Sequence, residues 1–256
     1  MAKTKKLLGI TTAALLILLY STLAVAQNEG FNVPLGAENA TTIRSETSNA
    51  SLYPPYEVPA IAGNLTELYI TGVSQTNSWQ GFFGNVTGTI ILEDASGNRF
   101  YDWSAAEPQG QVYASVNETI TWTDVECAPI DDAPYRDFWN GFYSMLDTDY
   151  DSINRTYNHT DHPEIYVGYT TLNNCRTAYT FVDSERQTED FPSLLLSSDN
   201  NSTLIFTAIL ENKTAGARSS IMGYDGNQYD FQLLVAEDGS QGNDQTTPYY
   251  FWLEIH

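Results

Sequence analysis

From residue 64 to residue 256 the chain alternates short runs of β-branched and aromatic residues with clusters of Gly, Asn, Asp and Pro. Closely spaced runs of this kind, divided by turn residues, are typical of antiparallel sheets. We therefore predict an all-β fold, an antiparallel β-sandwich of Ig-like or jelly-roll-like type. The expected strands are residues 65–73, 84–94, 98–105, 110–116, 118–127, 175–183, 202–210, 218–225, 228–238 and 247–256.

Residues 131–147 depart from this strand pattern. Asp132 is the expected N-cap of a helix, and Gly141 weakens that helix in isolation. We predict one short helix in the 131–147 region that covers an open end of a sheet. Its apolar stripe consists of Phe138, Trp139, Phe142, Met145 and Leu146, which recur at helical spacing.

The first 26 residues have the pattern of a secretory signal: three lysines, an apolar run, and Ala-Val-Ala ending at Ala26. Cleavage after Ala26 is the simplest interpretation. The alternatives are retention as an uncleaved anchor and processing at Gly9 by a pilin-type peptidase. Residues 27–63, rich in Asn, Ser, Thr and Pro, indicate an arm or linker. Residues 64–256 then form the extracellular domain, as one unit or as two packed sub-domains, 64–127 and 175–256.

Acidic residues outnumber basic ones by 32 to 11, for a formal net charge of −21. Removal of the signal would also remove its three lysines, which makes the remaining chain more negative. Binding to nucleic acid or to anionic lipid needs concentrated Lys and Arg. We therefore expect no nucleic-acid partner, and no membrane contact once the signal is removed. The expected partners are further copies of the chain, other cell-surface proteins, or glycans.

Two residue patterns fit a protein outside the cell. Cys127 and Cys175 are the only cysteines, and an exported chain would join them in a disulfide. Ten of the nineteen asparagines begin an Asn-x-Ser/Thr sequon, where chance would place about three or four. We expect most of them to carry glycans on exposed surface. The ten are Asn39, Asn49, Asn64, Asn85, Asn117, Asn154, Asn158, Asn200, Asn201 and Asn212.

Asp147, Asp149 and Asp151 alternate as carboxylates do in calcium-binding loops, so we treat them as candidate Ca²⁺ ligands. The loop is not an EF-hand, because it lacks the required Gly and Glu, and a solvated acidic loop is the alternative. No other cofactor is expected. The nearby string NHTDHPE gathers four potential zinc ligands but lacks a recognised spacing, so a surface loop is the preferred interpretation. The four are His159, Asp161, His162 and Glu164.

Residues 79–103 predict a hairpin, because NVTGTIIL and RFYDW are strand-like and Ser96, Gly97 and Asn98 suit a turn. This stretch, together with YDFQLLVAEDG and TPYYFWLEI, resembles a group of secreted proteins predicted from archaeal genomes. Those proteins share a W-x-G-x-x-G-N-x-x-G-x-I-x-L motif and an aromatic C-terminal strand. The resemblance covers most of residues 64–256 and implies an extracellular surface protein, with no assigned activity.

We expect a secreted, N-glycosylated cell-surface protein with a structural or interaction role, self-assembling into an extracellular filament or layer. The arm, residues 27–63, could add a strand to a neighbour's open sheet edge. A carbohydrate-binding or adhesion module is the alternative, with Trp79 and Trp103 as stacking surfaces. An extracellular hydrolase comes third. No Gly-x-Ser-x-Gly elbow or phosphate loop is present, so we expect no enzymatic activity.

Overall fold

The computed structural model describes residues 76–103, 109–211, 221–238 and 246–255, the strand Leu35–Gly36, and the single residues 62, 65 and 67. Contacts divide the chain into Met1–Asn32, which lies outside the described residues, and Val33–His256, to which everything below refers. Among the described residues, no helix is both long and apolar enough to span a membrane.

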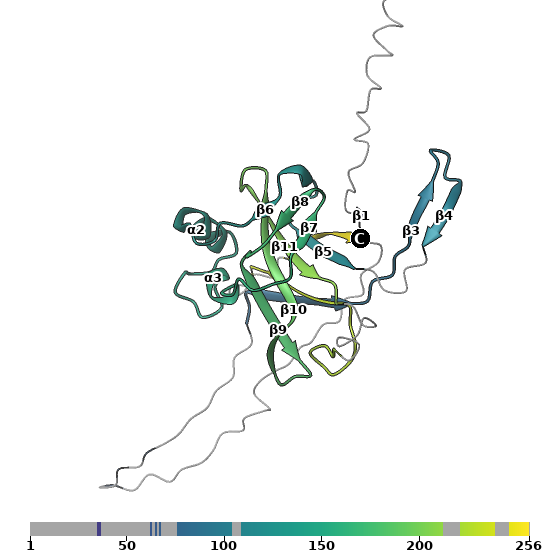
Figure 1. The fold of residues 1–256 in the computed structure, drawn as a ribbon. Helices are drawn as coiled ribbons and strands as arrows, with labels where there is room; N and C mark the ends of the chain where they lie inside the picture. Colours follow the sequence, from purple (N-terminus) through teal and green to yellow (C-terminus); the bar gives the residue numbers. More distant parts are fainter. Residues whose placement is uncertain are drawn as a thin grey trace, which may run out of the picture. The chain divides into compact units, whose positions relative to one another are not determined.

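The main sheet has seven antiparallel strands in the order β1-β13-β5-β11-β10-β6, with β9 also paired to β10 (Figure 1). Every strand pair in it is antiparallel, as the strand pattern predicted. The bounds are β1 Leu35–Gly36, β5 Gly110–Ser115, β6 Glu126–Cys127, β9 Thr177–Val182, β10 Arg186–Ser198, β11 Thr203–Ile209 and β13 Tyr250–Ile255.

Three two-stranded antiparallel sheets accompany the main sheet. The pair β12–β2 packs over β10 and β11, and the hydrophobic core fills the space between these two layers. The fold is therefore all-β and sandwich-like, which confirms the predicted class. The bounds are β2 Trp79–Gly84 with β12 Phe231–Ala236, β3 Ile90–Glu93 with β4 Arg99–Trp103, and β7 Ile165–Val167 with β8 Thr170–Leu172.

The two halves of the chain share their sheets. Strand β5 from the first half lies between β11 and β13 from the second, and β2 pairs with β12. The division into sub-domains 64–127 and 175–256 does not match this interleaved pairing. Long-range pairing of this kind leaves no mark on local sequence, since it depends on which strands meet after folding.

The disulfide between Cys127 and Cys175 is confirmed, and it closes a loop of 48 residues in sequence separation. The loop contains the predicted helix, α2 (Ala133–Phe142), and a second short helix, α3 (Ile153–Thr156). Asp132 is the N-cap residue of α2, although its side chain makes no capping hydrogen bond.

The predicted apolar stripe of α2 is only partly buried. Trp139 and Met145 lie in the core, whereas Phe138, Phe142 and Leu146 are exposed. The prediction was wrong for these three: Phe138 and Phe142 lie on α2 but on its exposed side, and Leu146 lies beyond the last helical residue, Phe142. Tyr143, just past the helix, is buried beside Trp139 instead.

Several expected strands differ from the observed ones. Residues 118–127 contain a 3₁₀ turn, η2 (Trp122–Asp124), and only two strand residues. Residues 221–223 have no regular structure and a turn begins at Tyr224, while most of residues 65–73 lie outside the described part of the chain. The longest strand, β10, was not predicted, because its polar first half and Pro192 argue against a strand. A register shift between Gln187 and Pro192 accommodates the proline.

Candidate functional site

Strand β13 is covered by side chains on both of its faces. Phe251 and Leu253 pack against the core, and the Phe251 ring lies 4.9 Å from the Phe82 ring in an edge-on arrangement. On the opposite face, Trp252 contacts Trp122, with ring centroids 5.6 Å apart. A strand that is apolar on both faces is usually found inside a sheet, with partners on both sides.

A buried carboxylate anchors β13 on the Trp252 face. Glu254 is 2% exposed, and its Oε2 accepts a hydrogen bond of 2.6 Å from the Tyr113 hydroxyl. Its Oε1 accepts a 3.0 Å bond from the Gly168 amide in the β7–β8 turn. Burial, and then the Glu254 charge, raise the pKa of Tyr113 well above its usual value. Tyr113 therefore stays a hydrogen-bond donor at any physiological pH.

On its inner side β13 pairs with β5 along its whole length, from Tyr250 opposite Ser115 to Ile255 opposite Gly110. Gly110 has a φ of 148°, and a Cβ there would lie 1.9 Å from the Glu254 carbonyl oxygen. Only glycine fits at this position, because the two backbones approach too closely for a side chain.

On its outer side, the part of the chain that the structure describes pairs with β13 at two positions. Leu35 and Gly36 of β1 lie opposite Leu253 and Trp252. Among the described residues, the other four positions of β13 have no strand partner on that side. Unpaired backbone groups at a sheet edge are a template for another extended segment. This outer edge of β13, together with β1, is the candidate site.

The hairpin β3–β4 is the second unusual surface. The Asp94 carboxylate accepts hydrogen bonds from Ser96 and Asn98, and Gly97 has a φ of 80°, so the predicted turn is confirmed. All residues of both strands except Ile91 are exposed. Large apolar side chains are among them, namely Ile90, Leu92, Phe100, Tyr101 and Trp103, with Phe100 84% exposed.

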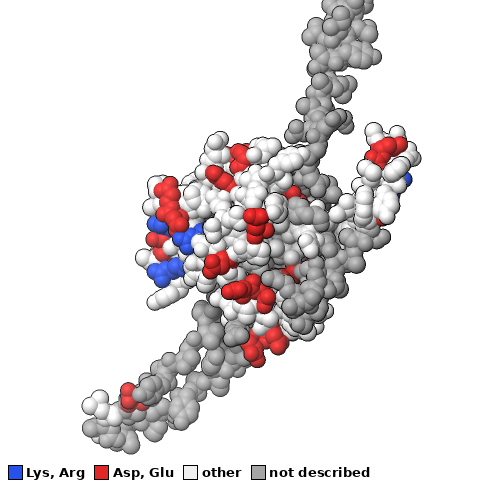
Figure 2. Space-filling model, in the orientation of Figure 1, with Lys and Arg blue, Asp and Glu red and all other residues white. Residues whose placement is uncertain are grey.

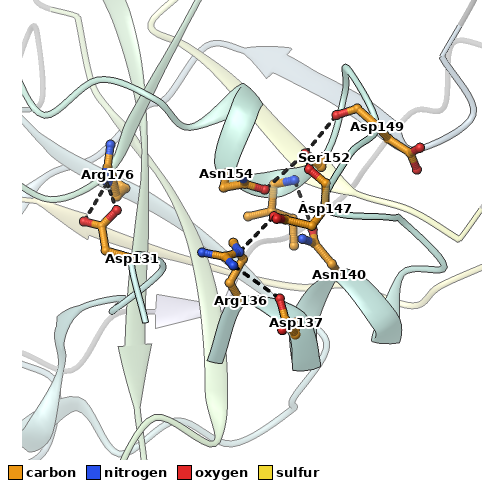
Figure 3. A network of polar contacts seen from close by, with 10 residues as sticks. Asp131, Arg136, Asp137, Asn140, Asp147, Asp149, Ser152, Asn154 and Arg176 are labelled. Atoms are coloured by element: carbon orange, nitrogen blue, oxygen red, sulfur yellow. Dashed lines mark hydrogen bonds and ion pairs between the residues drawn. The ribbon is translucent and has the colours of Figure 1, made fainter. Parts of the chain in front are cut away.

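The carboxylates of two candidate calcium ligands, Asp147 and Asp149, point in different directions (Figure 3). Asp147 pairs with Arg136 at 2.8 Å, and Asp149 accepts a 2.7 Å hydrogen bond from the Leu146 amide. Asp151 accepts a 2.6 Å bond from the Thr76 hydroxyl. Within the described residues, no group of three His, Cys, Asp or Glu side chains is placed to hold a metal ion. This geometry lends the calcium hypothesis no support.

The histidines of the zinc-like string have structural partners. His162 Nδ1 lies 2.7 Å from the Pro163 carbonyl, and Nε2 accepts a 2.8 Å hydrogen bond from the Cys175 amide. These two contacts require a neutral ring that carries its proton on Nδ1. His159 makes a backbone bridge to Thr177. The string therefore helps to seat the disulfide loop on β9.

Trp79 and Trp103 have different environments. Trp79 packs against Tyr157 and Phe206 in the core, and its Nε1 donates a 2.6 Å hydrogen bond to the Asp151 carbonyl. Trp79 is half-buried, and its role as a sugar-stacking surface stays a prediction. Trp103 is 49% exposed and lies beside Tyr101, with ring centroids 4.6 Å apart.

The sequons within the described residues also differ in environment. Asn85, Asn158 and Asn200 are exposed, whereas Asn117, Asn154 and Asn201 are half-buried. Asn117 Nδ2, the atom that would carry a glycan, donates a 2.7 Å hydrogen bond to Thr203. The remaining four, Asn39, Asn49, Asn64 and Asn212, lie outside the described residues.

No protein-family model matches the chain, and it has no significant match among curated proteins or solved structures.

Proposed function

We propose that the chain is a secreted, N-glycosylated cell-surface protein that assembles with further copies of itself by strand addition, into an extracellular filament or layer. The observation that carries this proposal is the pairing of Leu35 and Gly36 with the outer edge of β13. Both residues belong to the arm, residues 27–63. A segment of the arm therefore serves as a strand partner of this edge.

Strand addition suits this edge for a physical reason. The aromatic side chains of β13 already pack against other side chains on both faces of the strand. An added segment is therefore recognised mainly through its backbone groups. The chain between Gly36 and Thr76 can span up to about 130 Å when extended, so an arm has the reach to serve a neighbouring copy. Pairing within one chain and pairing between copies then use the same contacts and compete with each other.

The charge of the molecule disfavours indiscriminate association. Acidic side chains are spread over the visible face of the molecule, and most basic ones gather where α2 and α3 lie (Figure 2). Like charge repels copies that meet in the wrong orientation. Export is supported by the N-terminal pattern, the sequon excess and the disulfide.

Engineered disulfides test the register directly. Leu35 and Leu253 lie opposite each other, at a separation that a disulfide can bridge. One preparation carries Leu35→Cys and the other Leu253→Cys, and the two are mixed under mild oxidation at high protein concentration. We expect a cross-linked dimer on non-reducing gels. The native cysteines do not interfere, because both are in a disulfide.

A mismatched pair is the control. Leu35→Cys mixed with Tyr250→Cys places the thiols three positions out of register, and it should give far less cross-linked dimer. A dimer yield equal to that of the control, together with a strictly monomeric protein in light scattering at high concentration, would refute assembly by strand addition.

A carbohydrate-binding or adhesion role is the second candidate, because the Tyr101–Trp103 pair is exposed on the hairpin. Trp103→Ala should abolish binding on a glycan array while circular dichroism stays unchanged. Binding retained by Trp103→Ala would remove this surface from consideration.

A further inference from the structure

Asn85 differs from the other nine sequon asparagines in what precedes it. Phe83 stands two positions before it, whereas none of the other nine has an aromatic residue at that position. Asn85 is exposed and directly follows the last residue of β2, Gly84. Asn85 therefore stands two positions from Phe83 at the end of this strand, and residues two apart along an extended chain project to the same side.

Phe83 belongs to a cluster of three aromatic rings. Its ring centroid lies 4.7 Å from that of Tyr229 and 5.0 Å from that of Tyr224, both in edge-on arrangements. Tyr229 is held in place by a 3.0 Å hydrogen bond from its hydroxyl to Asp225. Tyr224 is held by its amide, which donates a 2.7 Å bond to Gln232. The cluster is fixed before any ligand arrives.

A cleft of about 280 Å³ opens beside this cluster. Phe83, Tyr224, Thr180 and Gln232 line it, and its wall is mostly apolar. Gly81 also lines it, and a Cβ at Gly81 would have nothing within 4 Å. A mostly apolar wall suits the C–H face of a pyranose ring, which gains dispersion contacts and buries apolar surface there.

We propose that Asn85 carries an N-linked glycan whose first sugar packs against Phe83 and occupies the cleft beside it. The donor is a polyprenyl-phosphate-linked oligosaccharide. Asn85 Nδ2 forms the new bond to the sugar C1 and loses a proton, while the C1–O bond to phosphate breaks and the phosphate leaves with the electron pair. The inference shares with the proposed function only the export of the chain.

The packed sugar stabilises the folded chain, because the cluster exists only when β2 and β12 are paired. Packing of the first sugar against the Phe83 ring should raise the melting temperature by about 2–4 °C in a domain of this length. Asn158 is the matched control. The residue two positions before it is Thr156, which is not aromatic, so a glycan on Asn158 would make no such contact.

The test uses the full chain, produced in a host that N-glycosylates exported proteins. Mass spectrometry of the peptide that contains Asn85 should show the glycan. Asn85→Gln should lower the melting temperature by about 2–4 °C, and Asn158→Gln should leave it unchanged. In a Phe83→Leu background, which keeps an apolar side chain but removes the flat ring, Asn85→Gln should have no further effect.

Three results would overturn the proposal: an unmodified Asn85, an equal effect of Asn85→Gln with and without Phe83→Leu, or equal effects at Asn85 and Asn158. If Phe83→Leu does not fold, NMR of the wild-type glycoprotein tests the packing of the sugar against Phe83.

In that experiment, protons of the first sugar should be shifted by the ring current of Phe83 and should show contacts to Tyr224 or Tyr229. Unshifted sugar protons would refute the packing. Assembly is read separately by cross-linking, so either proposal can fail alone.

Discussion

Gly110 is the residue on which the docking of β13 depends most directly. Gly110→Ala would place a Cβ 1.9 Å from the Glu254 carbonyl oxygen at a φ of 148°, which alanine disfavours. We expect the free energy of unfolding to fall by about 2–4 kcal/mol.

Gly81→Ala is the matched control, because its Cβ would meet nothing within 4 Å. Urea unfolding monitored by circular dichroism measures both variants. Equal midpoints for the two would contradict the close approach of β5 and β13.

His162 makes stability depend on pH. Its burial lowers the pKa below the usual 6.5, although the Pro163 carbonyl and Asp161 act in the opposite direction. The unfolded chain then binds the proton more tightly than the folded chain. The contribution of neutral His162 to the free energy of unfolding is therefore fully present above about pH 6.5, and it is lost as the pH falls from there through the lowered pKa. Protonation also breaks the hydrogen bond from the Cys175 amide.

Melting temperatures measured from pH 8 to pH 5 should therefore fall more steeply for the wild type than for His162→Asn. Parallel curves would mean that His162 titrates in the same way in the folded and unfolded chains.

At the scale of elements, the disulfide holds α2, α3 and the β7–β8 pair against the main sheet. Closing a loop of 48 residues stabilises by about 4 kcal/mol in the chain-entropy model. The double variant Cys127→Ala/Cys175→Ala should lose that amount in urea unfolding. A loss below about 1 kcal/mol would indicate that packing of Tyr157 and Ile153 alone holds the loop in place.

The β3–β4 hairpin should contribute little to global stability, because its side chains are exposed. Leu92→Ala is expected to change the free energy of unfolding by less than about 0.5 kcal/mol. Leu195→Ala, in the fully buried second half of β10, should cost about 2–5 kcal/mol. Comparable losses at both positions would show that the hairpin packs against a partner under the conditions of measurement.

At the scale of the whole molecule, the negative charge opposes contact between copies. The Debye length falls from about 10 Å at 0.1 M salt to about 3 Å at 1 M. Backbone pairing at the β13 edge carries no net charge, so screening should favour it. Sedimentation velocity in increasing NaCl should show larger species at high salt. Dissociation at high salt would indicate that ion pairs hold the copies together instead.

The sequence predicted the elements whose signal is local. The aromatic C-terminal strand, the Asp94–Asn98 turn and the helix at Ala133–Phe142 were all anticipated from periodicity and turn chemistry. The disulfide followed from the presence of only two cysteines in a chain that looks exported. These features depend on a few neighbouring residues or on simple counting, so they can be inferred before folding is considered.

The features that define the candidate site depended on tertiary structure. Nothing local in Leu35–Gly36 marks a strand, and Glu254 is an acid in an apolar run whose burial depends on Tyr113 and Gly168. Strand β10 exists despite Pro192 because β9, β6 and β11 pair along it. The alternation of residues along the chain thus determined that this protein is built of antiparallel strands. Which of these strands pair with one another was decided only by contacts between distant segments, since backbone hydrogen bonds form between whichever strands the packed core brings together.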